Sequence, residues 1–173
     1  IPLIMCFYSF FVDAAPKVLI VLSSYGVDKG ETKPGFEFDE FSQTYSIFKN
    51  NGLEIDIASP KGGNIEADKY DADKPYNQDF LNDKYAVEKL SSSLKLSQVN
   101  SSDYAAIFVV GGKGAMFDLP FDRNLQSLIA DVYQNNGSIG AVCHGPAALV
   151  DVKLSNGEYL VANKIVNSFT NEE

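Results

Sequence analysis

The sequence predicts an α/β fold with a doubly wound, mostly parallel sheet that carries helices on both faces. Continuous apolar runs of strand length recur along the chain, and segments with helical periodicity separate them. Strands that read as uninterrupted apolar runs are typical of parallel sheets that are buried on both faces. With 173 residues, 45% of them hydrophobic, the chain is long enough for one domain with a sizeable core.

The first half of the chain opens this alternation. "KVLIVLSS" (17–24) predicts a buried strand, and "LEIDIAS" (53–59) predicts a second one. Between them, 37–52 is predicted to form a helix, because apolar residues recur at helical spacing and Gly52 lies beyond its end. The stretch 60–82 is polar with little periodicity, and we expect a loop there. The apolar residues of the predicted helix are Phe41, Tyr45 and Phe48.

The second half continues the pattern. "LNDKYAVEKLSSSLKL" (81–96) predicts a helix, "YAAIFVVGG" (104–112) a strand, "FDRNLQSLIADVYQNNG" (121–137) an amphipathic helix and "SIGAV" (138–142) a final strand. The whole series is the flavodoxin-like arrangement. Sheets of this kind bind ligands at the carboxyl ends of their strands, so the residues that follow these strands are the candidates for a site.

Two rare residues stand side by side after the last predicted strand. In "GAVCHGPAAL", the only histidine, His144, follows Cys143, which is one of two cysteines. Because "GPAALV" predicts a helix with Pro146 in its first turn, Cys143 lies in a strand-to-helix turn, where the positive end of the helix favours a thiolate. The structural alternative is a cysteine that acts as a small buried hydrophobe. The turn, the helix start and His144 together favour a nucleophile.

Other groups converge on the same edge of the sheet. "GGKGAMFDLP" follows the strand at 104–112, and its glycines let backbone N–H groups approach a ligand. We expect Gly111, Gly112 and the backbone N–H of His144 to bind an oxyanion. A carboxylate from "GFEFDEF" can serve as general base. The sequence has neither the P-loop nor the GxGxxG fingerprint of nucleotide-binding sites.

The stretches "AVCHGPAAL", "VVGGKGAMFDLP" and "GFEFDEFSQTYSIFKNNGLEIDIASP" together resemble the ThiJ/PfpI superfamily, the relatives of class I glutamine amidotransferases. The resemblance runs from Lys17 to the last residue and is greatest to the branch of heat-shock chaperones with glyoxalase III activity. It implies that Cys143 is the nucleophile, that His144 assists it and that Glu40 handles protons. It implies no metal and no cofactor.

The glutamate has to be chosen among Glu37, Asp39 and Glu40. The family pattern, counted from Gly35, falls on Glu40. Helical spacing agrees, because Glu40 neighbours Phe41 and therefore borders the buried face of the helix. Glu37 is expected near the exposed helix start, and a solvated acidic first turn that interacts with the helix dipole accounts for Glu37 and Asp39.

Lys113 departs from the pattern, because the family commonly has histidine after the glycine pair. This difference leaves the backbone donors of the turn intact. We expect Lys113 to contact the substrate, where its positive charge either replaces the histidine or changes the choice of substrate.

The resemblance implies an enzyme that converts dicarbonyls such as methylglyoxal to hydroxy acids without glutathione, a lyase of the D-lactate dehydratase type. Cys143 attacks the aldehyde to form a hemithioacetal, Glu40 moves a proton between the two carbons, and hydrolysis of the thioester releases lactate. Two alternatives stay open. One is a non-catalytic stress chaperone or oxidant sensor that uses Cys143. The other is a related cysteine hydrolase, peptidase or deglycase.

The partners expected from the sequence are few. The net charge of −9 argues against nucleic acid and against anionic membranes, because both require a basic surface. The expected partner is a small dicarbonyl substrate, and a homodimer stays open.

The two ends of the chain carry further signals. "IPLIMCFYSFFV" followed by "VDAAP" predicts a signal peptide over 1–14 that is cleaved after Ala14, and hence secretion, with the cytoplasm as the alternative. The domain then spans 15–173 and keeps Cys143 as its single cysteine. Asn100 and Asn136 begin sequons. "TNEE" at 170–173 has the form of a helix start, which predicts a chain that is truncated at its C-terminus.

Overall fold

The structure is a computed structural model that describes residues 15–168. The predicted signal peptide over 1–14 and the predicted helix start at 170–173 lie outside the described residues.

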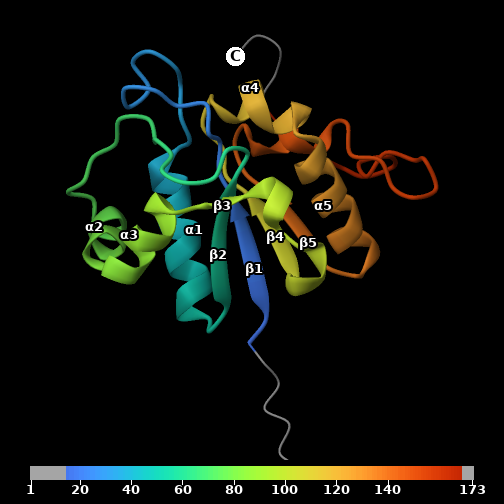
Figure 1. Ribbon diagram of the computed structural model, residues 1–173, viewed down its shortest axis with the longest axis horizontal. Coiled ribbons are helices and arrows are strands. Elements are labelled where there is room, and N and C mark those ends of the chain that lie inside the picture. Colours follow the sequence, from blue (N-terminus) through green and yellow to red (C-terminus); the bar gives the residue numbers. More distant parts are fainter. Residues whose placement is uncertain (1–14, 169–173) are drawn as a thin grey trace, which may run out of the picture.

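Five parallel strands form one sheet in the order β3-β2-β1-β4-β5 (Figure 1). The central strand β1 pairs with β2 on one side and with β4 on the other, so the order of the strands reverses between β1 and β4. This topology confirms the predicted doubly wound fold. The strands are β1 (Lys17–Val21), β2 (Glu54–Ser59), β3 (Leu94–Lys95), β4 (Ala106–Val109) and β5 (Ser138–Ala141).

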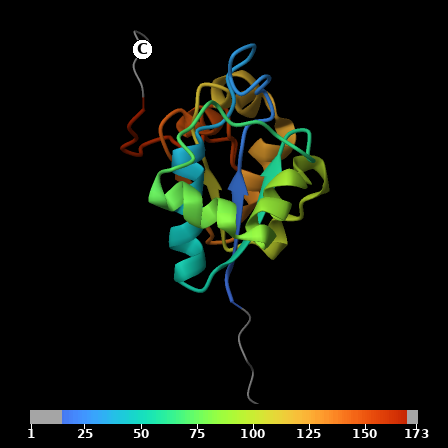
Figure 2. The same cartoon turned by 90° about the vertical axis from the view of Figure 1, so that its left-hand side faces the viewer.

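Each face of the sheet is covered by its own apolar core. Side chains alternate along β1, so Leu19 and Val21 pack on the side of α5 (Arg123–Gln134), while Ile20 packs on the side of α1 (Phe38–Asn50). Figure 1 shows α1 to α3 on one side of the sheet and α5 on the other, and Figure 2 shows the layers from the side of α2 and α3. Burial on both faces explains why these strands read as continuous apolar runs.

The stretch predicted as a loop over 60–82 contains a helix, α2 (Pro75–Asn82). Pro75 occupies the first turn, where its missing N–H has no intrahelical partner to lose. Phe80 is buried, and its ring packs edge-on against three aromatic rings of α1. The loop prediction was therefore wrong at its end, because tertiary packing holds this short helix.

The helix predicted over 81–96 is shorter than expected. It begins after Asp83, whose carboxylate accepts hydrogen bonds from the amides of Tyr85 and Ala86, and forms α3 (Lys84–Ser91). The chain then enters β3 instead of continuing the helix. The cap at Asp83 thus separates α2 from α3.

The predicted helix at 145–150 is a 3₁₀ segment, Gly145–Leu149. A short α-helix, α4 (Ala115–Asp118), follows the glycine turn after β4. Three more 3₁₀ segments connect the elements: Leu96–Gln98, Ser101–Asp103 and Leu119–Phe121.

A polar cluster fastens α1 to α2. Asn77 is fully buried, and its amide nitrogen donates to Asp39 Oδ1 at 2.6 Å and to the carbonyl of Asp71 at 2.8 Å. Its amide oxygen accepts a hydrogen bond of 2.6 Å from Ser42 Oγ. Asp39 also forms an ion pair with Lys74. Asp39 is therefore a structural tether, which corrects the expectation that it is a solvated residue of the first turn.

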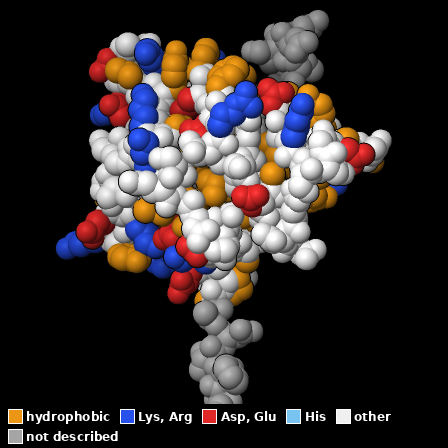
Figure 3. All heavy atoms as spheres, turned by 45° about the vertical axis from the view of Figure 1, so that its right-hand side comes forward, with side chains coloured by type: hydrophobic (Ala, Val, Ile, Leu, Met, Phe, Trp, Pro, Cys, Tyr) orange, Lys and Arg blue, Asp and Glu red, His pale blue; other side chains and the backbone are white. Residues whose placement is uncertain are grey.

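Over residues 15–168, no helix combines the length and the apolar character that crossing a membrane requires. On the face drawn in Figure 3, acidic and basic side chains lie interspersed among apolar ones.

Replacing Asn77 tests the tether between α1 and α2. Asn77→Ala should lower the free energy of unfolding by about 2 kcal/mol, because buried hydrogen-bonding groups of its neighbours lose their partner. Gln78→Ala removes a similar amide from an exposed position on the same helix and should change stability by less than about 0.5 kcal/mol. Urea unfolding of the two variants measures the difference. Equal losses would show that the cluster does not hold α2.

Candidate active site

The candidate site lies at the carboxyl edge of the sheet. Gly111 and Gly112 follow β4, Cys143 follows β5, and the loop after β1 leads into α1, which carries Glu40. Because β1 and β4 are neighbours where the strand order reverses, these segments meet at the topological switch point of the sheet. The fold thus brings together residues that are about a hundred positions apart in the sequence.

Cys143 has a left-handed backbone with φ of +56°. For a residue with a side chain, this conformation costs about 1–2 kcal/mol. Hydrogen bonds on both sides hold it: Val142 N donates to the carbonyl of Val109 at 3.1 Å, and Gly145 N donates to the carbonyl of Val142 at 2.7 Å. A Cβ at Gly145 would lie 2.5 Å from the Val109 carbonyl oxygen. The glycine therefore lets the strained turn sit tightly against β4.

Three of the predicted residues meet at the sulfur. Cys143 Sγ lies 3.2 Å from His144 Nδ1. The thiol also hydrogen-bonds to the Glu40 carboxylate, whose Oε2 accepts a hydrogen bond of 2.9 Å from Gly111 N. Glu40 reaches the sulfur because Gly111 has no side chain: a Cβ there would lie 2.6 Å from the Cβ of Cys143 and 2.7 Å from Glu40 Oε2.

The predicted oxyanion donors divide into two roles. The backbone amides of Gly112 and His144 face the sulfur and act to lower the pKa of its thiol. The amide of Gly111 donates to Glu40 instead, so its prediction as an oxyanion donor needs correction. Gly112 has φ of +89°, and a Cβ there would lie 2.5 Å from the amide nitrogen of Glu37. Its conformation and its close packing both require glycine.

Burial raises the pKa of the Cys143 thiol, and the neighbouring Glu40 carboxylate raises this pKa further. The amides of Gly112 and His144 act in the opposite direction but do not cancel the rise. The predicted lowering of this pKa by a helix end was therefore wrong. The segment that follows is a five-residue 3₁₀ helix, which supplies little dipole, and a carboxylate faces the thiol.

A pocket of about 460 Å³ opens over Cys143 and His144. Lys113 lines this pocket and is exposed, and its contact with a substrate stays a prediction. Glu40 does not line the pocket, because it contacts the sulfur from the side of Gly111. The other lining residues are Lys29, Gly30, Glu31, Pro34, Glu37, Asp68, Lys69 and Gly112.

Glu37 also lines this pocket, which corrects the expectation that it is a solvated residue at the exposed helix start. It is partly buried, and this burial raises its pKa, while its carboxylate caps α1 by accepting from Asp39 N. The signal for its position is the pair of buried neighbours, Phe36 and Phe38. Because side chains alternate along an extended segment, Glu37 must point away from the core that buries these two rings.

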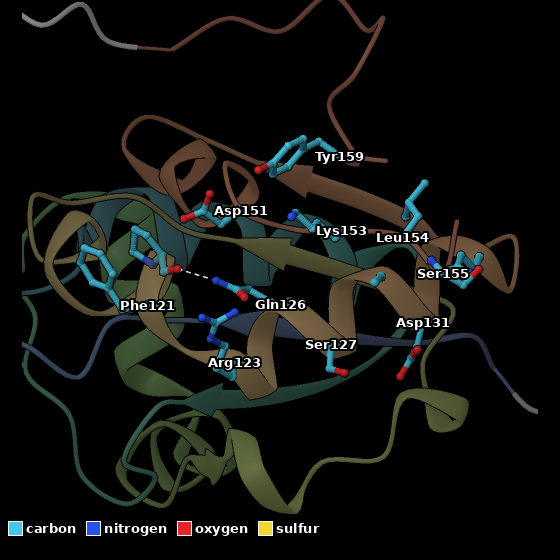
Figure 4. A pocket seen from close by; sticks show the side chains of 13 residues that line it. Phe121, Arg123, Gln126, Ser127, Asp131, Asp151, Lys153, Leu154, Ser155 and Tyr159 are labelled. Carbon is cyan, nitrogen blue, oxygen red and sulfur yellow. Dashed lines mark hydrogen bonds between the residues drawn. The ribbon is translucent and has the colours of Figure 1, made fainter. Parts of the chain in front are cut away.

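A larger hollow lies elsewhere on the molecule. It measures about 870 Å³ and runs between α5 and the segment 151–159 (Figure 4). Arg123 and Lys153 line it, and Gln126 donates a hydrogen bond of 2.7 Å to the carbonyl of Pro120. Neither Cys143 nor His144 lines it, and both line the smaller pocket, so the smaller pocket is the candidate active site. In the part of the chain that the structure describes, no group of three or more His, Cys, Asp or Glu side chains is placed to hold a metal ion.

The chain is similar to known proteins along most of its length. Glutathione-independent glyoxalase hsp3102 of Schizosaccharomyces pombe is 34% identical over 162 residues, which cover 88% of this chain and 67% of that protein. Glutathione-independent glyoxalase HSP31 of Saccharomyces cerevisiae is 32% identical over 168 residues, which cover 91% of this chain and 70% of that protein.

Solved structures agree with this similarity. The structure of glyoxalase III from Candida albicans superposes with a TM-score of 0.80 at 28% identity and covers 91% of this chain and 69% of that chain. The Rapid Encystment Protein 24 kDa of Francisella tularensis superposes with a TM-score of 0.82 at 36% identity, covering 91% of this chain and 71% of that chain. The sequence model of the DJ-1/PfpI family matches residues 32–169, and the chain therefore belongs to the DJ-1/PfpI family.

Proposed function

We propose that this chain is a glutathione-independent glyoxalase, which converts α-oxoaldehydes such as methylglyoxal to 2-hydroxy acids. The observation that carries the proposal is the contact of one sulfur with two proton-accepting groups, Glu40 and His144, beneath an open pocket. The names of the relatives in yeasts support the same reaction.

The first step joins the sulfur to the aldehyde carbon. Because the pKa of Cys143 is raised, the thiol gives up its proton as it attacks, and the Glu40 carboxylate that accepts its hydrogen bond takes this proton. The aldehyde oxygen becomes negative during the attack. The amides of Gly112 and His144, which face the sulfur, stabilise this charge. Glu40 then passes the thiol proton to this oxygen, which gives a hemithioacetal and restores the carboxylate for the second step.

The second step moves hydrogen between the two carbons of the substrate. Glu40 removes the proton from the former aldehyde carbon, which gives an enediolate, and returns this proton to the former ketone carbon, while the hydroxyl proton moves to the former ketone oxygen. The aldehyde carbon is oxidised while the ketone carbon is reduced, so the electrons balance within the substrate. The product is a thioester of Cys143. Water then cleaves the thioester, releases the 2-hydroxy acid and restores the thiol.

Three variants test these roles by turnover of methylglyoxal. Cys143→Ser should abolish turnover, because a serine hydroxyl is a much weaker nucleophile than sulfur. Glu40→Gln should lower kcat about a hundredfold or more, since it removes the group that moves protons. Glu88→Gln makes the same chemical change at an exposed position on α3 and should leave kcat within about twofold.

Normal turnover by Glu40→Gln would contradict the proposed mechanism. An inactive parent protein that nevertheless suppresses aggregation of unfolded proteins would favour the chaperone alternative. Folding of each variant is checked by circular dichroism.

The same carboxylate should control the ionisation of the thiol. Glu40 raises the pKa of Cys143 through its charge and its hydrogen bond, so Glu40→Gln should move the pH midpoint of alkylation by iodoacetamide to lower pH. An unperturbed cysteine has its midpoint at about pH 8.5, and the midpoint of the parent protein should lie above this value. Glu88→Gln should keep the parent midpoint. An unchanged midpoint in Glu40→Gln would show that the carboxylate does not govern the thiol.

A further inference from the structure

Positively charged side chains gather around the thiol pocket without partners. Lys29, Lys69 and Lys113 all line it together with Cys143. Over residues 15–168, five lysine side chains make no ion pair, hydrogen bond or ring contact, and three of the five are these. The other two, Lys84 and Lys95, belong to α3 and β3. The concentration of free cations at one pocket stands out in a chain whose net charge is −9.

Two of these lysines, Lys29 and Lys69, are held close to the pocket by hydrogen bonds between backbone amides and neighbouring acidic side chains. Lys29 N donates to Glu66 Oε2 at 3.0 Å. Next to Lys69, Asp68 accepts a hydrogen bond of 2.6 Å from Gly35 N through its side chain, and its own amide donates to the carbonyl of Phe36 at 2.9 Å. The loop that carries Lys29 and the segment that carries Lys69 are therefore fastened to each other.

Lys113 is held from the opposite side. The glycines on both sides of it pack against the segment before α1, and Gly114 N donates to the carbonyl of Gly35 at 3.0 Å. Lys113 is the one residue of the glycine turn 111–114 that has a side chain, and this side chain is exposed at the pocket. It begins next to Gly112, whose amide faces the sulfur.

The acidic residues of the pocket offset only part of this positive charge. Asp68 is engaged by the amide of Gly35, and Glu37 caps α1. Burial raises the pKa of Glu37, so its carboxyl group holds a proton more readily than an exposed one does. Glu31 is the exposed carboxylate among the lining residues. A bound anion would therefore meet three unpartnered ammonium groups and few competing acids.

We propose that Lys113, together with Lys29 and Lys69, selects α-oxoaldehydes that carry a carboxylate at the end remote from the aldehyde. This inference rests on the proposed glyoxalase function and specifies its substrate class. A volume of about 460 Å³ leaves room for a substrate longer than the three carbons of methylglyoxal, since one water molecule fills about 30 Å³. The aldehyde lies at Cys143, and the carboxylate lies toward the lysines.

The simplest compound of this class is 4,5-dioxopentanoate. With one water it gives 2-hydroxyglutarate and one proton: the aldehyde carbon becomes the new carboxylate, and the ketone carbon becomes the alcohol. The remote carboxylate does not react. A matched neutral compound is 2-oxopentanal, which has the same number of carbons and a methyl group in place of the remote carboxylate.

The test compares kcat/KM for these two compounds. The parent protein should prefer 4,5-dioxopentanoate, and the preference should weaken as salt is added, because salt screens exposed charges. Lys113→Gln should reduce the ratio of the two kcat/KM values about fivefold, the effect of one exposed ion pair. Lys113→Arg should retain most of the preference. Lys84→Gln, which removes an unpartnered lysine far from the pocket in sequence, should leave the ratio unchanged.

A parent protein that turns over both compounds without preference, or a ratio unaffected by Lys113→Gln, would overturn the inference while the glyoxalase function stands. Turnover of neither compound by a protein that consumes methylglyoxal would also overturn the inference, whereas failure to turn over methylglyoxal as well would refute the proposed function. Anion recognition is then measured without turnover, by the protection of Cys143 from iodoacetamide. Better protection by 2-hydroxyglutarate than by 2-hydroxypentanoate, lost in Lys113→Gln, would support the lysine site, and equal protection would overturn it.

Discussion

The hydrogen bond of 2.9 Å from the amide of Gly111 to Glu40 joins the end of β4 to the first turn of α1. The position of the carboxylate beside Cys143 depends on this bond, and the bond depends on the missing side chain of Gly111. The two apolar cores on the faces of the sheet hold the bonded parts in register. The geometry of the sulfur is thus set by packing far from the pocket.

The site balances opposing influences on one atom. Burial and Glu40 keep the sulfur protonated, while the amides of Gly112 and His144 are arranged to receive negative charge. An aldehyde that binds beside the amides gives this charge a better location on oxygen. The two amides then stabilise the negative oxygen while the bond between sulfur and carbon forms. Stabilisation at this stage accelerates the reaction, because it lowers the free energy of the transition state.

The sequence was sufficient for four of the five strands, for α1 and α5, and for placing Cys143 and the glycine turn at one edge of the sheet, because apolar periodicity and the edge rule of parallel sheets determine them. It was not sufficient for β3, which lies inside the helix predicted over 81–96, and the choice of Glu40 depended on the family resemblance. It was not sufficient for α2, whose few apolar residues show no period and whose stability comes from Phe80 and Asn77 in contact with α1. The pKa of the thiol could not be predicted from the sequence either, because it depends on which carboxylate lies beside the sulfur.

Because the backbone of Cys143 is left-handed, the residue that favours folding at this position differs from the residue that the reaction requires. A survey of all amino acids there would rank glycine above alanine for abundance of folded protein, since only glycine adopts this φ freely. The same survey would rank both as inactive. Cysteine survives at such a position only under selection for its chemistry, so a sequence with glycine there would mark a relative that keeps the fold after the reaction has been lost.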